Sequence, residues 1–128
     1  MNDNELKSLI DRAVTATVLK LKTEGLLIKP ISSVEKTEEL LRQYPVLQGV
    51  DEPYAERVAR EVETCLEESR NEPYADVIRL FYFDGLKNAA CAKRLNCDER
   101  TARRARKQLV KQFSARLASE DFIRELLL

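Results

Sequence analysis

A run of cations near the C-terminus has the clearest capacity for chemistry in this chain. Residues 87–116 hold ten Lys or Arg side chains, opposed only by Asp98 and Glu99. Lys and Arg bind anions, and Arg forms paired hydrogen bonds with phosphate and with guanine. Such a run is either a solvated helix face or a contact for an anionic partner, and its context must decide between them.

The charges are distributed unevenly along the chain. The 128 residues balance 22 basic side chains against 22 acidic ones, a formal net charge of zero. Residues 1–86 carry 11 basic and 17 acidic side chains (−6), residues 87–116 carry ten and two (+8), and residues 117–128 carry one and three (−2). This asymmetry predicts a localised anionic partner, although the neutral total alone argues against a nucleic acid.

The residue types give no support to catalysis. Cys65, Cys91 and Cys97 form no C-x-x-C pair, and the chain contains no His to complete a metal site or to activate a nucleophile. There is no Gly-rich phosphate loop, so we expect no enzyme activity, metal, cofactor or small-molecule substrate. Reduced thiols fit a cytoplasmic protein, and the polar first residues do not resemble a secretory signal.

The elements that must position the cations are predicted to be helices. Gly and Pro number only seven together, and alternating β-branched segments are almost absent, which indicates an all-α fold. No apolar run approaches the length of a membrane span. Apolar spacing and capping signals predict helices over residues 3–23, 32–43, 52–69 and 72–83, with a connector at 26–31 and with Pro45 and Gly49 closing the second helix.

A four-residue repeat marks two of these helix starts. Glu52-Pro53-Tyr54-Ala55 recurs as Glu72-Pro73-Tyr74-Ala75, and Pro in a first helical turn is a start signal. We therefore expect two similar helix beginnings. Between them, residues 51–72 carry eight acids and three bases, a solvated face by default or a contact for RNA polymerase or for the protein's own basic helix.

The basic segment itself has the pattern of a short helix, a tight turn and a longer helix. Residues 88–95 are small and apolar on one side, Asn96 suits a left-handed turn position, and Asp98 suits an N-cap. In helix 98–117 an apolar stripe leaves the Arg and Lys side chains on another face; it comprises Ala102, Ala105, Leu109, Phe113 and Leu117. This spacing favours a helix-turn-helix that reads DNA over a merely solvated face.

The segment YADVIRLFYFDGLKNAACAKRLNCDERTARRARKQL (Tyr74–Leu109) resembles region 4 of sigma-70-type factors, which reads promoter −35 elements. More closely, the chain resembles small phage and prophage regulators of the ArpU/RinA type, which control late, packaging or lysis genes; Ser32–Pro45 and Ser119–Leu127 share this likeness. The resemblance implies a sequence-specific regulator of transcription that binds double-stranded DNA. Two departures, Ala89-Ala90-Cys91-Ala92 and Ala102, are smaller than the family pattern and put helix packing in doubt more than binding.

Site roles are transferred residue by residue. Candidates for the base groove are Arg100, Thr101, Arg103, Arg104 and Lys107. Candidates for DNA phosphates are Lys87, Lys93, Arg94 and Lys111.

Three functions stay open from the sequence: a transcriptional regulator, a DNA-recognition subunit of a phage packaging machine similar to a small terminase, and a protein-binding helical domain. Residues 1–50 are expected to form an N-terminal helical segment, and residues 51–128 the DNA-binding domain with its support helix. Because one helix-turn-helix buries little surface on DNA, we expect a homodimer or a contact with RNA polymerase. The apolar stripe at residues 6–21 either packs within the monomer, which we favour, or joins two subunits.

Overall fold

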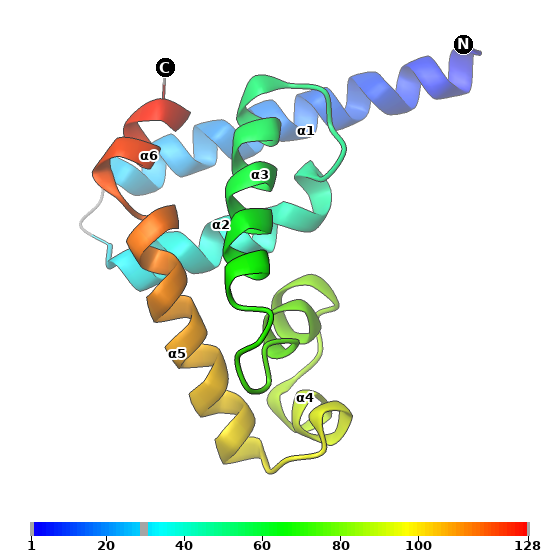
Figure 1. The fold of residues 1–128 in the computed structure, drawn as a ribbon. Coiled ribbons are helices and arrows are strands. Elements are labelled where there is room, and N and C mark those ends of the chain that lie inside the picture. The colour runs from blue at the N-terminus through cyan, green and yellow to red at the C-terminus, as the bar shows by residue number, and fades with distance from the viewer. Residues whose placement is uncertain (1, 29–30, 128) are drawn as a thin grey trace.

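The fold is built entirely from helices in the part of the chain that the structure describes. The computed structural model describes residues 2–28 and 31–127, which contain no strand and no helix long and apolar enough to cross a membrane (Figure 1). The elements are α1 (Asp3–Ile28), α2 (Ser33–Leu47), α3 (Pro53–Glu68), the π-helix η1 (Arg79–Phe83), α4 (Asn88–Leu95), α5 (Glu99–Leu117) and α6 (Glu120–Leu126).

Helix α2 lies at the centre of the packing. It contacts α1, α3, α5 and η1, and its Leu40, Leu41 and Leu47 are almost completely buried. A single hydrophobic cluster contains side chains from Ala16 to Leu126, so both the 1–50 and the 51–128 segments contribute to it. The division of the chain at residue 50 stays a prediction.

Three buried polar side chains connect the first three helices. The Tyr54 hydroxyl donates to Gln43 Oε1 at 2.6 Å and lies 2.8 Å from Thr23 Oγ1, while Gln43 Nε2 donates to Thr23 Oγ1 at 2.9 Å. Burial raises the pKa of Tyr54 to about 12, so its hydroxyl keeps its proton. Buried polar atoms are costly unless they are paired, and this triad pairs one side chain each from α1, α2 and α3.

The two Glu-Pro-Tyr-Ala segments adopt different conformations. At the first, Glu52 accepts a hydrogen bond from the Ala55 backbone N–H at 2.9 Å and α3 begins at Pro53, as predicted. At the second, Tyr74 has a left-handed φ of 59° and residues 69–76 form a series of turns. The predicted helix 72–83 is therefore wrong in its first half. Tyr54 is 2% exposed and hydrogen-bonded in the core, whereas Tyr74 is 39% exposed.

Two predicted helix ends are also wrong. Helix α1 continues through Gly25 to Ile28 instead of ending before Gly25, and the rest of the expected connector falls partly outside the described residues. Helix α2 passes through Pro45 to Leu47, because a Pro near the end of a helix removes only one backbone hydrogen bond. The predicted Ser32 cap is confirmed: its Oγ accepts from the Glu35 backbone N–H at 3.1 Å.

The apolar stripe of α1 does not pack within the monomer, which corrects the interpretation that we favoured. The face of α1 that is buried consists of Ala16 and Thr23, with Leu19 partly buried. The stripe points elsewhere and its large side chains are exposed: Leu6, Leu9, Ile10, Val14, Val18 and Leu21. Only one side of α1 therefore packs against the rest of the protein.

The duplicated tetrapeptide provides a matched test of the polar triad. We expect Tyr54→Phe to lower the free energy of unfolding by about 1–3 kcal/mol, because it leaves the buried Gln43 Oε1 without its hydrogen-bond donor, while Gln43 Nε2 and Thr23 Oγ1 stay paired with each other. The control Tyr74→Phe removes an exposed hydroxyl and is expected to change it by less than about 0.5 kcal/mol. Urea denaturation followed by circular dichroism measures both. Equal effects of the two substitutions would contradict the structural role of the triad.

Candidate nucleic-acid interface

The turn between α4 and α5 is fixed by its own sequence. Asn96 has a left-handed backbone (φ 55°, ψ 47°), as predicted, and ends α4 with its N–H directed at the carbonyl oxygens of Ala92 and Lys93. Asp98 caps α5: its Oδ1 accepts from the Thr101 backbone N–H at 2.6 Å. Both helix ranges expected from the sequence are confirmed, so local signals are sufficient to place this pair of helices.

Small side chains form the contact between α4 and α5. Cys91 and Ala92 of α4 and Ala102 of α5 are each 5% exposed or less. These three residues belong to the two segments where the sequence is smaller than the pattern that it resembles; of the other two residues in those segments, Ala89 is exposed and Ala90 half-buried. Further along α5, a buried face runs over Leu109, Val110, Phe113 and Leu117. Helix α5 is thus held on one side along most of its length.

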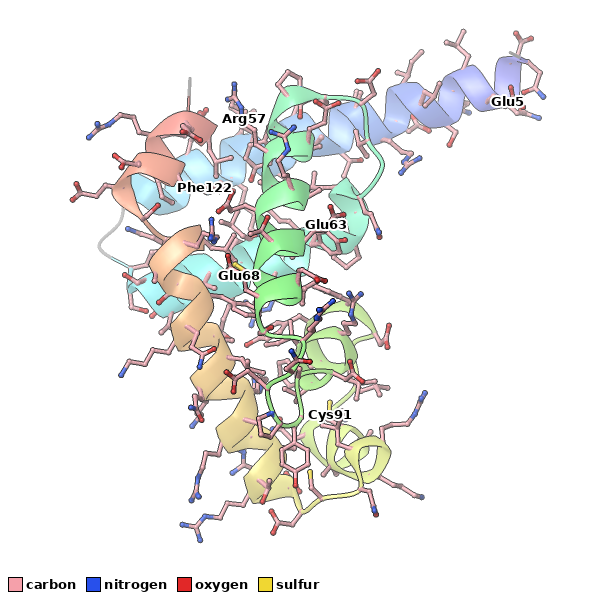
Figure 2. All side chains as sticks on the ribbon, in the orientation of Figure 1. Glu5, Arg57, Glu63, Glu68, Cys91 and Phe122 are labelled. Atoms are coloured by element: carbon pink, nitrogen blue, oxygen red, sulfur yellow. The ribbon has the colours of Figure 1, made fainter. Side chains whose placement is uncertain are left out.

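The opposite side of α5 carries the cations. Arg100, Arg103, Arg104, Lys107 and Lys111 follow steps of three and four residues and are all exposed. In Figure 2 side chains that end in nitrogen project outward from the first half of α5, away from the body of the molecule. Lys87, Lys93 and Arg94 are exposed at the two ends of α4. The structure therefore brings the cations that are predicted to contact DNA together at one end of the molecule.

One predicted base-groove residue is engaged within the chain. Arg103 Nη2 pairs with Glu99 Oε1 at 3.0 Å across one turn of α5. Among the residues that the structure describes, the other seven predicted cations form no ion pair: Lys87, Lys93, Arg94, Arg100, Arg104, Lys107 and Lys111. Glu99 is consequently neutralised locally, which reduces the negative charge at the start of α5.

Thr101 differs from the other candidates because it is half-buried at the edge of the basic face. With Arg104 it lines a hollow of about 300 Å³, whose opposite wall includes Glu72, Pro73 and Tyr74. Its backbone N–H is already used by the Asp98 cap. Thr101 is therefore less accessible to a partner than the cations beside it.

Two cations of the basic run turn toward the protein instead. The Arg106 guanidinium lies 3.8 Å from the centre of the Phe81 ring, and Arg116 pairs with Glu61 at 3.0 Å and with Glu68 at 2.5 Å. Glu68 is visible between α3 and α5 in Figure 2. The acidic helix α3 thus contacts the protein's own basic helix, one of the uses that the sequence left open for it.

The sequence contained a signal for one of these inward cations. Arg106 follows Ala102 by four residues and precedes Leu109 by three, so helical spacing places it within the apolar stripe. A cation there must cover an apolar or aromatic surface, as Arg106 does with Phe81. The direction of Arg116 has no such local signal, because its acidic partners lie about 50 residues earlier in the chain.

The described residues contain no metal-binding arrangement beside the cations. In the described ranges 2–28 and 31–127, no three His, Cys, Asp or Glu side chains gather closely enough to hold a metal ion. Cys65 and Cys91 are buried free thiols and Cys97 is half-buried. Burial raises the pKa of Cys65 to about 12, so that side chain remains a protonated thiol at neutral pH.

Comparison of the chain with family models, with curated proteins and with solved structures finds no match. The case for a function therefore depends on the residues and their geometry.

The Asp98 cap generates a prediction about acid stability. The hydrogen bond from the Thr101 backbone N–H lowers the pKa of the Asp98 carboxyl below its ordinary value. Because the folded-state pKa is the lower one, the cap stabilises the protein at neutral pH, and this contribution disappears as the pH falls below about 4. Asp98→Asn keeps a capping group that does not titrate.

We therefore expect the difference in melting temperature between the parent and Asp98→Asn to change below about pH 4, with the parent losing relative stability. Thermal unfolding of both proteins from neutral to acidic pH measures it, and all other carboxyl groups are common to the two. A difference that stays constant over this range would show that the cap makes no charge-dependent contribution.

Proposed function

We propose that α4, the turn at residues 96–98 and α5 form a helix-turn-helix that binds double-stranded DNA, with α5 in the major groove. The observation that carries the proposal is the division of α5 into two faces. Its apolar face is buried from Ala102 to Leu117, and its exposed face carries five cations beginning in the first turn. A solvated helix face needs no such concentration of one sign of charge at one end of an otherwise acidic protein.

The dimensions of α5 agree with this proposal. The exposed cations extend from Arg100 to Lys111, which spans about 17 Å at the helical rise of 1.5 Å per residue. The major groove is about 12 Å wide and admits one α-helix with its side chains. Because the first turn of α5 lies at the end of the molecule beside α4, that turn can enter the groove before the body meets the backbone (Figure 1).

The positions of the cations favour base contacts for some of them and phosphate contacts for others. Arg100, Arg104 and Lys107 are exposed and form no ion pair in the described chain, so they are the principal base-groove candidates. Arg103 can join them by exchanging Glu99 for DNA, and Thr101 is a peripheral contact. Cations beside the groove suit phosphates, which position the protein without specifying sequence; they are Lys87, Lys93, Arg94 and Lys111.

The biological role that we propose is regulation of transcription, with phage or prophage late genes as the targets implied by the resemblance of residues 74–109 and their flanks. A cytoplasmic location in a bacterial host and a contact with RNA polymerase belong to the same proposal. The supporting feature is the basic face of exposed cations on α4 and α5.

The double variant Arg100→Ala/Arg104→Ala tests the assignment of the reading face. A bidentate Arg–guanine contact is worth about 1–3 kcal/mol, so we expect specific binding to weaken by about 30-fold or more. The probe is the duplex sequence that the parent protein selects from a random library, and the readout is fluorescence anisotropy. Arg60→Ala/Arg124→Ala is the control, because it also removes two exposed Arg side chains but from α3 and α6.

The proposal requires the control to bind within about twofold of the parent. Equal loss in both variants would mean that the total charge matters and the reading face does not. Failure of the parent to select or retain any duplex would reject DNA binding and leave an acidic protein as the partner of the basic face. Circular dichroism of each variant establishes that helicity is unchanged.

The eight exposed cations also predict how affinity depends on salt. If five to eight of them neutralise phosphates, the logarithm of the binding constant falls with the logarithm of salt concentration with a slope of about −4 to −7. Lys93→Ala, a phosphate candidate, is expected to reduce the size of this slope by about one while preserving the selected sequence. Titrations of duplex DNA at several salt concentrations measure both, and a flat dependence contradicts the proposal.

A further inference from the structure

Helix α1 carries an apolar face that the rest of the chain does not cover. Its large aliphatic side chains are each 46–60% exposed, so about half of their apolar surface is in contact with water. These side chains are Leu6, Leu9, Ile10, Val14, Val18 and Leu21. The body packs against another side of the helix, through Ala16, Leu19 and Thr23. A contiguous exposed apolar patch of this kind is typical of an interaction site.

The first half of α1 extends away from the body. In Figure 1 its N-terminal end lies beyond the other helices, and Figure 2 shows Glu5 near this free end. A hydrogen bond from Arg12 Nη2 to the Gln48 carbonyl oxygen at 3.0 Å joins this part of α1 to the body. The stripe is therefore accessible along its whole length to a partner of similar shape.

The spacing of the stripe is symmetric about its own midpoint. Counted from the middle between Ala13 and Val14, two pairs of large apolar positions match across the midpoint, Leu6 with Leu21 and Leu9 with Val18, while Ile10 corresponds to the polar Thr17. When two such helices lie antiparallel, each of these side chains meets its counterpart on the other helix. An interface with two-fold symmetry requires this self-complementarity.

The charges of α1 are complementary to a second copy in the same orientation. Residues 3–11 carry Asp3, Glu5 and Asp11 against Lys7, a net charge of −2. Residues 12–28 carry Arg12, Lys20 and Lys22 against Glu24, a net charge of +2. An antiparallel pair places the net negative half of each helix beside the net positive half of its partner, whereas a parallel pair places halves of like net charge together. The complementarity is one of net charge: in the register above Glu5 is level with Lys22 of the second copy, but Lys7 is level with Lys20 and Asp3 with Glu24.

We infer that the exposed stripe of α1 is a homodimerisation surface on which a second copy of this chain packs antiparallel. A lipid surface fits less well, because helices that lie on anionic membranes carry an excess of cations, and α1 carries four acidic and four basic side chains. The inference rests on α1 alone and does not depend on DNA binding.

Sedimentation equilibrium of the full chain over about 1–100 μM tests the inference. We expect the parent to form a dimer and Val14→Glu, in the middle of the stripe, to raise the dimer dissociation constant at least tenfold. Val34→Glu in α2 is the matched control, because it makes the same change at another exposed valine, and it is expected to stay within about twofold of the parent. Circular dichroism monitors folding, since Val14 is 57% exposed and its substitution leaves the core intact.

Charge reversal tests the orientation. Glu5→Lys/Asp11→Lys makes both halves of α1 positive, so an antiparallel dimer weakens severalfold. Adding Lys20→Glu returns residues 12–28 to a net charge of zero and is expected to recover part of the affinity. Lys22 is left in place, because its Nζ pairs with Glu39 of α2 at 3.2 Å. A parallel dimer would be nearly insensitive to the first pair of changes, because like charges face each other before and after them.

Several results would overturn the inference. A parent that remains monomeric at about 100 μM has no such interface. Equal weakening by Val14→Glu and Val34→Glu would place any dimer contact elsewhere. Monomeric protein that binds phosphatidylglycerol vesicles through Val14 would instead assign the stripe to a lipid surface.

Discussion

The packing of one face of α5 on the remaining helices is the constraint on which the candidate site depends. Side chains from Ala102 to Leu117 are buried against α2, α3 and α4, which fixes the rotation of α5 about its own axis. Because the cations alternate with these residues at helical spacing, fixing the apolar face also fixes the direction of the Arg and Lys side chains. The hydrophobic core therefore sets the direction of the cations of α5.

Although the total charge is neutral, the cations of residues 87–116 form two groups with different contacts. Arg106 and Arg116 are used within the protein, one over Phe81 and the other between Glu61 and Glu68 of α3. Both carboxylates favour the charged guanidinium and raise the pKa of Arg116. The eight remaining cations of the run are exposed at one end of the molecule, opposite a largely acidic body. The net negative charge of such a body disfavours its approach to a polyanion and so favours the orientation in which the basic face leads.

The two proposals concern opposite ends of the chain and reinforce each other if both hold. A helix-turn-helix recognises a short half-site, and dimers gain specificity by reading two half-sites about 34 Å apart. Two copies joined through α1 would present two α5 helices related by a two-fold axis. The buried triad of Thr23, Gln43 and Tyr54 ties α1 to α2 and α3, so an interface on α1 would be connected to the core that orients α5.

The sequence by itself determined the helical class, the limits of α4 and α5, and the Asn96 and Asp98 turn, because caps, left-handed positions and helical periodicity act within a few residues. It also identified the cations that the structure gathers on one face. Only the tertiary structure decided that the second Glu-Pro-Tyr-Ala segment forms turns, that Arg116 faces α3, and that the stripe of α1 points outward. These features depend on residues distant in sequence: a tyrosine, an arginine or an apolar stripe is buried only where folding supplies a partner for it, and local pattern contains no information about where that partner will lie.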